Sequence, residues 1–114
     1  MRDAKIDINE SIIKKYVESK RPEDPEIRAQ LDFGYSYDGR YVILFEIRPD
    51  WNNPKEFQHR EFAKIRYYKS REEWNLYWMR GSGKWEIYGP FPESNQLKRI
   101  LKIINEDKYG CFYG

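Results

Sequence analysis

The feature that most constrains the fold is a strict alternation of apolar and polar residues from Ile27 to Tyr37. A period of two over this length predicts a β-strand with one face toward a core. The pair Asp38–Gly39 follows directly and is favoured in two-residue type I′ turns. A second apolar run extends from about Arg40 to Arg48 and stops at Pro49. This segment therefore predicts a β-hairpin with its turn at Asp38–Gly39.

Three more segments have the apolar and aromatic content of strands. They are EFAKIRYYK (61–69), WNLYWMR (74–80) and KWEIY (84–88). The residues from 49 to 60 include two prolines and an Asn-Asn pair, so we expect an irregular loop there. A two-residue type II′ turn at Gly81–Ser82 would place Trp78 opposite Trp85 on one face of the sheet.

Two helices are expected, one before the strands and one after them. Asp7 and Glu10 have the spacing of a capping box, with Asn9 as a rival N-cap. This helix should end before Pro22, because the residue before a proline avoids helical geometry. We expect Ser94 to cap the second helix. Its apolar positions recur at helical spacing and are Leu97, Ile100, Leu101 and Ile104.

Together these elements predict a single α+β domain over residues 1–114. Its core is an antiparallel β-sheet meander of about five strands, flanked by an N-terminal and a C-terminal helix. A chain of 114 residues can bury one core but not two. The aromatic share of 18% and the charged share of 35% favour a small core of large rings beneath a charged surface.

The sequence features that bear on location predict a cytoplasmic protein. The single cysteine cannot form an internal disulfide, which favours a reducing compartment. The first ten residues are charged where a signal peptide needs an apolar run. No apolar stretch approaches the ~20 residues of a membrane span, so we expect no membrane partner.

The residues after the second helix raise a separate question. Cys111 stands fourth from the end, where a prenylated cysteine would be, but aromatic residues and a glycine follow it. We therefore expect this tail to be part of the core. Gly110 would redirect the chain after the helix, and Cys111 and Phe112 would fold back as buried apolar groups.

One candidate enzyme site combines Asp32 with Glu46 and Arg48. This order resembles the Asp…Glu-x-Lys arrangement of metal-dependent nucleases, in which two carboxylates converge on Mg²⁺. The predicted turn pairs Asp32 with Phe45 and Glu46 with Leu31, so the carboxylates would point to opposite faces. Arg48 also stands in place of the lysine. A nuclease or other hydrolase centred on Glu46 and Arg48 is thus an alternative. A structural role is favoured, as an ion pair between these two residues or of either one with Arg28, Lys64 or Arg66 on a neighbouring strand.

Candidate binding residues form two groups. Arg48 and Trp51 would wall a polar pocket at the end of the sheet. The second group is Lys64, Arg66, Arg80 and Lys84. These cations are interleaved with aromatic residues, a combination that holds single-stranded nucleic acid, so a single-stranded nucleic-acid binding module is a second alternative. The balance of 21 Lys and Arg against 19 Asp and Glu lacks the basic excess typical of dedicated nucleic-acid binders.

The second strand is apolar on both of its sides. The residues on the far side are Tyr41, Ile43, Phe45 and Ile47. If both helices cover one face of the sheet, this side stays open for a partner, and a self-complementary patch would give a homodimer. One histidine, His59, and one distant cysteine make a poor metal site, so we expect no metal and no cofactor. The leading interpretation is a small non-enzymatic binding or protein-interaction module.

The order of several phrases resembles a known family. The phrases are RPEDPEIRAQLDFGYSYDGRYVILFEIRPDWNNP, FAKIRYYK, WNLYWMR, KWEIY and EDKYGCFYG. They are similar to a small bacterial family classed as a domain of unknown function, family 3024, over nearly the whole chain. Family members often carry an acidic residue near Ser82 and a histidine where Glu86 stands. The resemblance implies a bacterial origin and supplies no activity, ligand or catalytic residue.

Overall fold

The computed structural model describes residues 7–113. In chain order its elements are α1 (Ile8–Lys20), α2 (Pro25–Arg28), β1 (Asp32–Tyr37), β2 (Tyr41–Pro49), β3 (Phe57–Tyr68), β4 (Glu73–Met79), β5 (Trp85–Ile87), β6 (Glu93–Ser94) and α3 (Leu97–Glu106). The strands β1 to β5 form an antiparallel meander in sequence order, and the short β6 pairs with β4. The predicted α+β class with an N-terminal and a C-terminal helix is confirmed.

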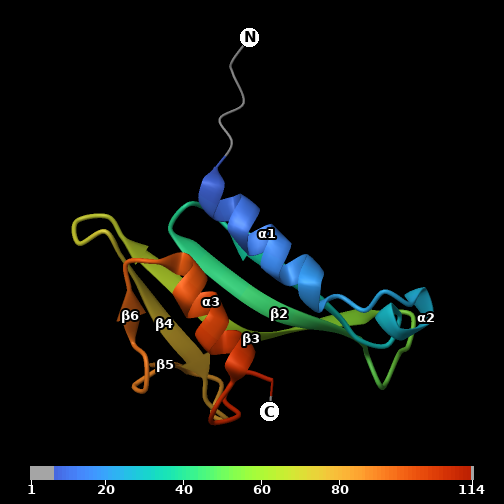
Figure 1. Ribbon diagram of the computed structural model, residues 1–114. Helices are drawn as coiled ribbons and strands as arrows, with labels where there is room; N and C mark the ends of the chain where they lie inside the picture. The colour runs from blue at the N-terminus through green and yellow to red at the C-terminus, as the bar shows by residue number, and fades with distance from the viewer. Residues whose placement is uncertain (1–6, 114) are drawn as a thin grey trace.

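Both long helices lie on the same face of the sheet. Figure 1 shows α1 and α3 side by side in front of the strands. The buried side chains of α1, Ile13 and Val17, and those of α3 join the core cluster with Val42 and Leu44 of β2. The opposite face of the sheet carries neither of these helices. Within residues 7–113 no helix has the length and apolar character needed to cross a bilayer.

The ends of α1 follow from local chemistry. The Asp7 carboxylate accepts hydrogen bonds from the backbone amides of Asn9 (2.9 Å) and Glu10 (3.4 Å), so Asp7 rather than Asn9 is the N-cap. The helix ends at Lys20, and Arg21 is already extended. This break is expected for a residue that precedes Pro22.

The alternating segment is shorter as a strand than predicted. Pro25–Arg28 form the single turn α2, and β1 begins at Asp32. The Asp24 carboxylate accepts the amide of Glu26 at 2.9 Å, and proline at the first helical position suits a helix start. Ile27 is therefore 53% exposed and lies outside the sheet.

The first hairpin turns one residue later than predicted. Asp38 and Tyr41 close the turn, so Gly39 and Arg40 occupy its centre. The Asp38 carboxylate accepts the amides of Arg40 (2.9 Å) and Tyr41 (2.8 Å), and Gly39 has a φ of 93° that favours glycine. Asp32 therefore pairs with Ile47 instead of the predicted Phe45.

This change displaces the strand pairing by two residues. Glu46 pairs with Phe33 and not with Leu31. Because side chains alternate with a period of two, a displacement of two keeps every side chain on its predicted face. Asp32 and Glu46 thus lie on opposite faces of the sheet, as the predicted turn required.

The second hairpin differs from its prediction by one residue. Its loop has three residues, Gly81 to Gly83, and Gly83 has a φ of 85°. Such a loop typically ends in a left-handed glycine. Trp78 pairs with Glu86 rather than with Trp85. A displacement of one residue exchanges the two faces, so Trp78 lies on the helix side and Trp85 on the other side.

A β-bulge interrupts the pairing of β2 with β3. Leu44 pairs with Ala63, but Phe45 pairs with Glu61, which leaves Phe62 as the extra residue. The side chain of Phe62 is 4% exposed, and its ring lies 6.3 Å from that of Phe33. Beyond the bulge β3 extends back to Phe57, so residues 57–60 are strand where an irregular loop was predicted.

The apolar stripe of α3 is buried as predicted, but its start is different. Its buried residues are Leu97, Ile100, Leu101 and Ile104. Gln96 is the N-cap residue and makes no side-chain cap. Ser94 belongs to β6, and its hydroxyl accepts the amide of Gln96 at 3.0 Å. The serine therefore orders the chain just before the helix and does not cap it.

The tail packs on the core through Phe112. Its side chain is 3% exposed, and its ring lies 5.0 Å from that of Tyr88. Asp107 ends α3 in a left-handed conformation, and its carboxylate accepts the amides of Phe112 (3.0 Å) and Tyr113 (2.8 Å). Cys111 is half-buried, less than predicted, and burial raises the pKa of its thiol.

We predict that Phe112→Ala lowers the free energy of unfolding by about 3–5 kcal/mol, because it empties a buried aromatic site. Tyr109→Ala is the control: this ring is 61% exposed, and its removal should change stability by about 0.5 kcal/mol or less. Urea denaturation of both variants measures the difference. Equal effects of the two substitutions would contradict the packing of the tail.

Candidate functional site

The face of the sheet opposite α1 and α3, here called the open sheet face, gathers aromatic and basic side chains. Strand alternation places on it Tyr41, Ile43, Phe45 and Ile47 of β2, Lys64, Arg66 and Tyr68 of β3, Tyr77 of β4 and Trp85 of β5. All of these residues are half-buried. They come from four adjacent strands, so the sheet itself sets their spacing.

Lys64 lies at the centre of three aromatic rings. Its Nζ is 4.7 Å from the ring centre of Tyr77, 5.6 Å from Trp85 and 5.8 Å from Tyr41. Each ring presents its negative face to the cation, and such contacts contribute about 0.5–1 kcal/mol at exposed sites and more where water is excluded. The rings thereby fix the direction of the ammonium group.

Arg66 continues this arrangement along β3. Its Cζ lies 4.3 Å from the ring centre of Tyr68 and 5.4 Å from that of Tyr41. Its Nη1 donates a hydrogen bond to the Tyr68 hydroxyl at 3.1 Å, while its buried Nε has no hydrogen-bond partner. Among residues 7–113, neither Lys64 nor Arg66 forms an ion pair with a carboxylate. The open sheet face therefore holds two neighbouring cations whose charge a bound anion would neutralise.

The hydroxyls of Tyr68 and Tyr77 lie 3.3 Å apart. The hydrogen bond with Tyr77 and the charges of Arg66 and Arg71 lower the pKa of Tyr68. Desolvation, followed by the hydrogen bond with Tyr68, raises the pKa of Tyr77 to about 12. Tyr68 is therefore the member of the pair that loses its proton first.

A basic hollow lies beside Arg66, between the β1–β2 turn and the β3–β4 turn. It has a volume of about 590 Å³, and Arg40, Arg66 and Lys69 are among its lining residues. Asp38 also lines it, but its carboxylate accepts the two backbone amides of the turn. The hollow thus places two further cations, Arg40 and Lys69, near Arg66 at this edge of the molecule.

Glu46 does not share a site with Asp32. The Glu46 side chain is 6% exposed and accepts hydrogen bonds from Arg48 Nε (3.3 Å) and Arg60 Nη1 (3.4 Å). Asp32, on the opposite face, forms a two-point ion pair with Arg21 at 2.9 Å, and this arginine holds the pKa of the carboxyl below its usual range. Each carboxylate is therefore paired with arginine, separately from the other.

The part of the chain that the structure describes contains no group of three or more His, Cys, Asp or Glu side chains placed to hold a metal ion. The ring of His59 stacks on that of Phe45, with centres 4.6 Å apart. The nuclease hypothesis required a second carboxylate beside Glu46, and the geometry gives that place to two arginines.

The other predicted binding residues are dispersed. Trp51 is 87% exposed in the loop between β2 and β3. Arg80 forms an ion pair with Glu86 at 3.4 Å, and Glu86 is on the helix side of β5. Lys84 is exposed at the turn before β5. The structure thus brings together Lys64 and Arg66 and leaves Arg48, Trp51, Arg80 and Lys84 apart from them.

Sequence reasoning missed the rings around these two cations. Trp85 was predicted on the same face as Trp78, because a two-residue turn at Gly81–Ser82 was expected in place of the three-residue loop. Tyr41 was expected on the far side of the second strand, which is correct, but no pattern placed it beside Lys64, and Tyr77 had no separate signal. The second glycine of the loop, Gly83, was the available clue, because its left-handed φ requires the longer loop.

The chain matches a known protein family over its whole length. The model of the family "Domain of unknown function (DUF3024)" matches residues 1–114. The chain belongs to this family. Neither the curated proteins nor the solved structures contain a match to the chain. The resemblance of the sequence phrases to this family is thus confirmed.

We predict that Tyr68→Phe removes a phenol whose pKa lies below its usual value, because Tyr77, Arg66 and Arg71 stabilise the phenolate of Tyr68. Ultraviolet absorbance of tyrosinate measured against pH should show wild-type ionisation beginning below the ordinary tyrosine value of about 10. Tyr68→Phe should abolish this early phase, and Tyr109→Phe should retain it. An unchanged early phase in Tyr68→Phe would contradict the assignment.

Proposed function

We propose that this protein is a single-domain, non-enzymatic module that binds single-stranded nucleic acid on its open sheet face. One observation carries the proposal: Lys64 and Arg66 stand side by side among aromatic rings without a carboxylate partner within residues 7–113. Phosphates supply the missing negative charge, and bases supply flat surfaces that stack on rings.

The arrangement favours nucleic acid over a simple anion. Tyr77 and Trp85 flank Lys64 on one side, and Tyr41 lies between Lys64 and Arg66. Stacking of one base on such a ring contributes about 1–3 kcal/mol, and neighbouring cations attract the backbone between the bases. The affinity then depends on a local cluster, which is compatible with a net charge of +2.

The single-stranded form fits this surface better than a duplex. Rings on a sheet bind base faces, and in a duplex those faces are stacked on one another inside the helix. Single strands present unstacked bases at a cost far below that of opening a duplex. The basic hollow beside Arg66 extends the path for the backbone past the edge of the sheet.

The homodimer remains a prediction, and the open sheet face offers it little support. Two copies joined by this face would bring the Lys64 and Arg66 pairs toward each other, and like charges in a dehydrated interface oppose association. The lone cysteine and the bacterial family resemblance lead us to assign the module to the bacterial cytoplasm as part of the same proposal.

The first test measures the affinity for labelled oligonucleotides of about ten nucleotides, as DNA and as RNA, by fluorescence anisotropy at low salt. We expect Trp85→Ala and Lys64→Gln each to weaken binding about tenfold, because each removes one stacking platform or one phosphate partner. The matched control is Lys98→Gln, an identical charge change on the helix side, which should leave the affinity unchanged. Failure of the wild-type protein to bind either oligonucleotide would overturn the proposal.

A second prediction concerns salt. The logarithm of the affinity for a single strand falls with the logarithm of salt concentration by about 0.7 for each phosphate neutralised. Lys64→Gln should reduce this slope by about that amount, whereas Trp85→Ala should lower the affinity with the slope retained. If Lys98→Gln reduces the slope as much as Lys64→Gln does, binding is general attraction to surface charge.

A further inference from the structure

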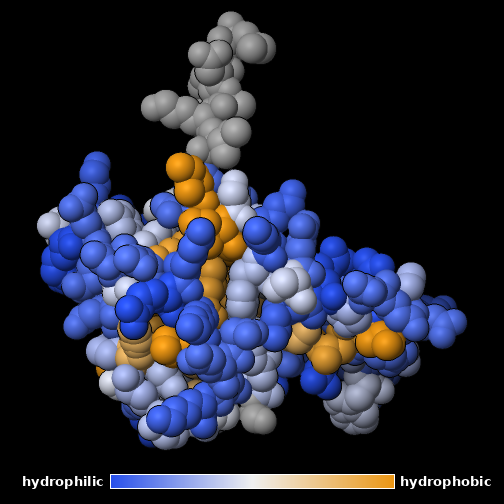
Figure 2. All heavy atoms as spheres, in the orientation of Figure 1, coloured by the Kyte–Doolittle hydropathy of each residue, from blue (hydrophilic) through white to orange (hydrophobic). Residues whose placement is uncertain are grey.

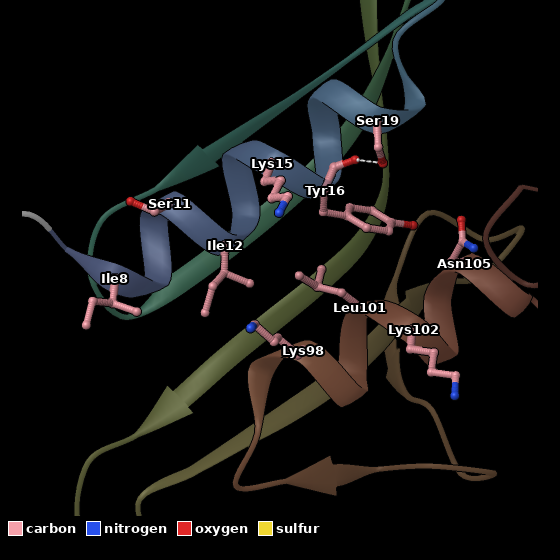
Figure 3. Close-up of a pocket in the computed structure, with 10 residues that line it drawn as sticks. All are labelled: Ile8, Ser11, Ile12, Lys15, Tyr16, Ser19, Lys98, Leu101, Lys102 and Asn105. Atoms are coloured by element: carbon pink, nitrogen blue, oxygen red, sulfur yellow. Dashed lines mark hydrogen bonds between the residues drawn. The ribbon is translucent and has the colours of Figure 1, made fainter.

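A groove runs between α1 and α3 on the side of the molecule away from the open sheet face. Its volume is about 590 Å³, and residues of these two helices line it. One end is closed, because Lys20 Nζ donates to Asn105 Oδ1 at 2.7 Å and the hydroxyls of Tyr16 and Tyr113 lie 2.6 Å apart. Figure 3 shows Tyr16 and Asn105 near this end of the groove and Ile8 and Lys98 toward the other.

The interior of the groove is apolar. Leu101 forms a buried floor, Ile12 is half-buried, and Ile8 in the first turn of α1 is 71% exposed. Figure 2 shows a hydrophobic stripe between the two helices, open toward the viewer and bordered by hydrophilic side chains. When a partner removes an isoleucine side chain from water, the free energy of the system falls, which favours binding.

The borders of the groove are basic. Lys15 of α1 and Lys98 and Lys102 of α3 line it, and its lining residues include no aspartate or glutamate. Within residues 7–113 none of these three lysines forms an ion pair. Lys98 and Lys102 are four residues apart on one helix, a spacing at which like charges repel. An anionic occupant would relieve this repulsion.

The open shape of the groove favours one kind of anionic occupant over the others. Because the groove is open along its length, whatever fills it keeps an outer face in water. An alkyl chain has no polar face and would leave apolar surface exposed, whereas an amphipathic helix has one apolar and one polar face. A second copy of this chain is a poor match, since its own groove borders are also basic.

We infer that the groove between α1 and α3 binds an amphipathic α-helix with acidic flanks, supplied by a partner protein. Its apolar stripe lies on Ile8, Ile12 and Leu101, and its carboxylates face Lys15, Lys98 and Lys102. This binding is separate from the proposed function, because it uses the opposite side of the molecule. Both surfaces can be occupied at once, which would make the protein an adaptor between a nucleic acid and a protein.

The test uses a fluorescein-labelled model peptide of about 18 residues, roughly five helical turns, with leucines at helical spacing and glutamates on the flanks. A scrambled peptide of the same composition lacks the stripe, and a third peptide carries lysine in place of glutamate. Anisotropy gives the affinity, and amide chemical shifts in nuclear magnetic resonance spectra locate the contact. We expect the glutamate peptide to bind and the scrambled peptide to bind at least about tenfold more weakly. The amide signals that change on addition of the glutamate peptide should be mainly those of α1 and α3.

Charge reversal makes the test specific. The double variant Lys98→Glu, Lys102→Glu should bind the glutamate peptide about tenfold or more weakly than the wild-type protein does. It should bind the lysine peptide more strongly. The matched control is Lys14→Glu with Lys108→Glu, the same charge change on exposed residues outside the groove. This control should leave both affinities unchanged. Circular dichroism confirms that the variants are folded.

Several outcomes would overturn the inference. If the scrambled peptide binds as tightly as the glutamate peptide, charge alone attracts the peptide. If the amide chemical-shift changes are confined to the open sheet face, the peptide does not bind in the groove. Sodium laurate that perturbs the groove amides and displaces the peptide at lower concentration would assign the groove to a small amphiphile. Concentration-dependent shifts of groove amides without peptide would assign it to a second copy. None of these outcomes affects oligonucleotide binding, so the two proposals can fail independently.

Discussion

The β-bulge at Phe62 is the constraint on which the two sides of the sheet depend. Without the extra residue, the pairing of Leu44 with Ala63 would continue to place Glu46 opposite Glu61, and like charges directly opposed destabilise a sheet. With the bulge, Arg60 lies opposite Glu46 and binds its carboxylate. The same step turns Phe62 into the core, where its ring meets that of Phe33.

The bulge also separates β3 into two parts with different roles. Its later part carries Lys64 and Arg66 on the open sheet face, between rings from β2, β4 and β5. Half-buried cations lose hydration, and aromatic faces replace only part of it. Neither cation has a carboxylate partner in residues 7–113, and this is the feature on which the proposed binding role depends. On the helix side, the groove combines the exposed Ile8 and the half-buried Ile12 with three lysines at its borders.

Each predicted face was right or wrong according to whether the strand pairing was displaced by an even or an odd number of residues. The first hairpin was displaced by two residues, so the separation of Asp32 from Glu46 was predicted correctly although both pairings were wrong. The second hairpin was displaced by one residue, so the prediction that Trp85 shares a face with Trp78 was wrong. Local turn chemistry decides such steps: a carboxylate at Asp38 and a left-handed Gly83 each select one loop among several that the pattern allows.

Periodicity and residue size act locally along the chain, and from them the α+β class, the order of the strands, the buried stripe of α3 and the packing of Phe112 on the core were predicted correctly. Three features appear only in the folded chain: both helices cover one face, Phe62 is a bulge, and rings from four strands surround two cations. These features depend on contacts between residues far apart in the chain. A pattern read along one segment carries no information about which distant segment lies against it.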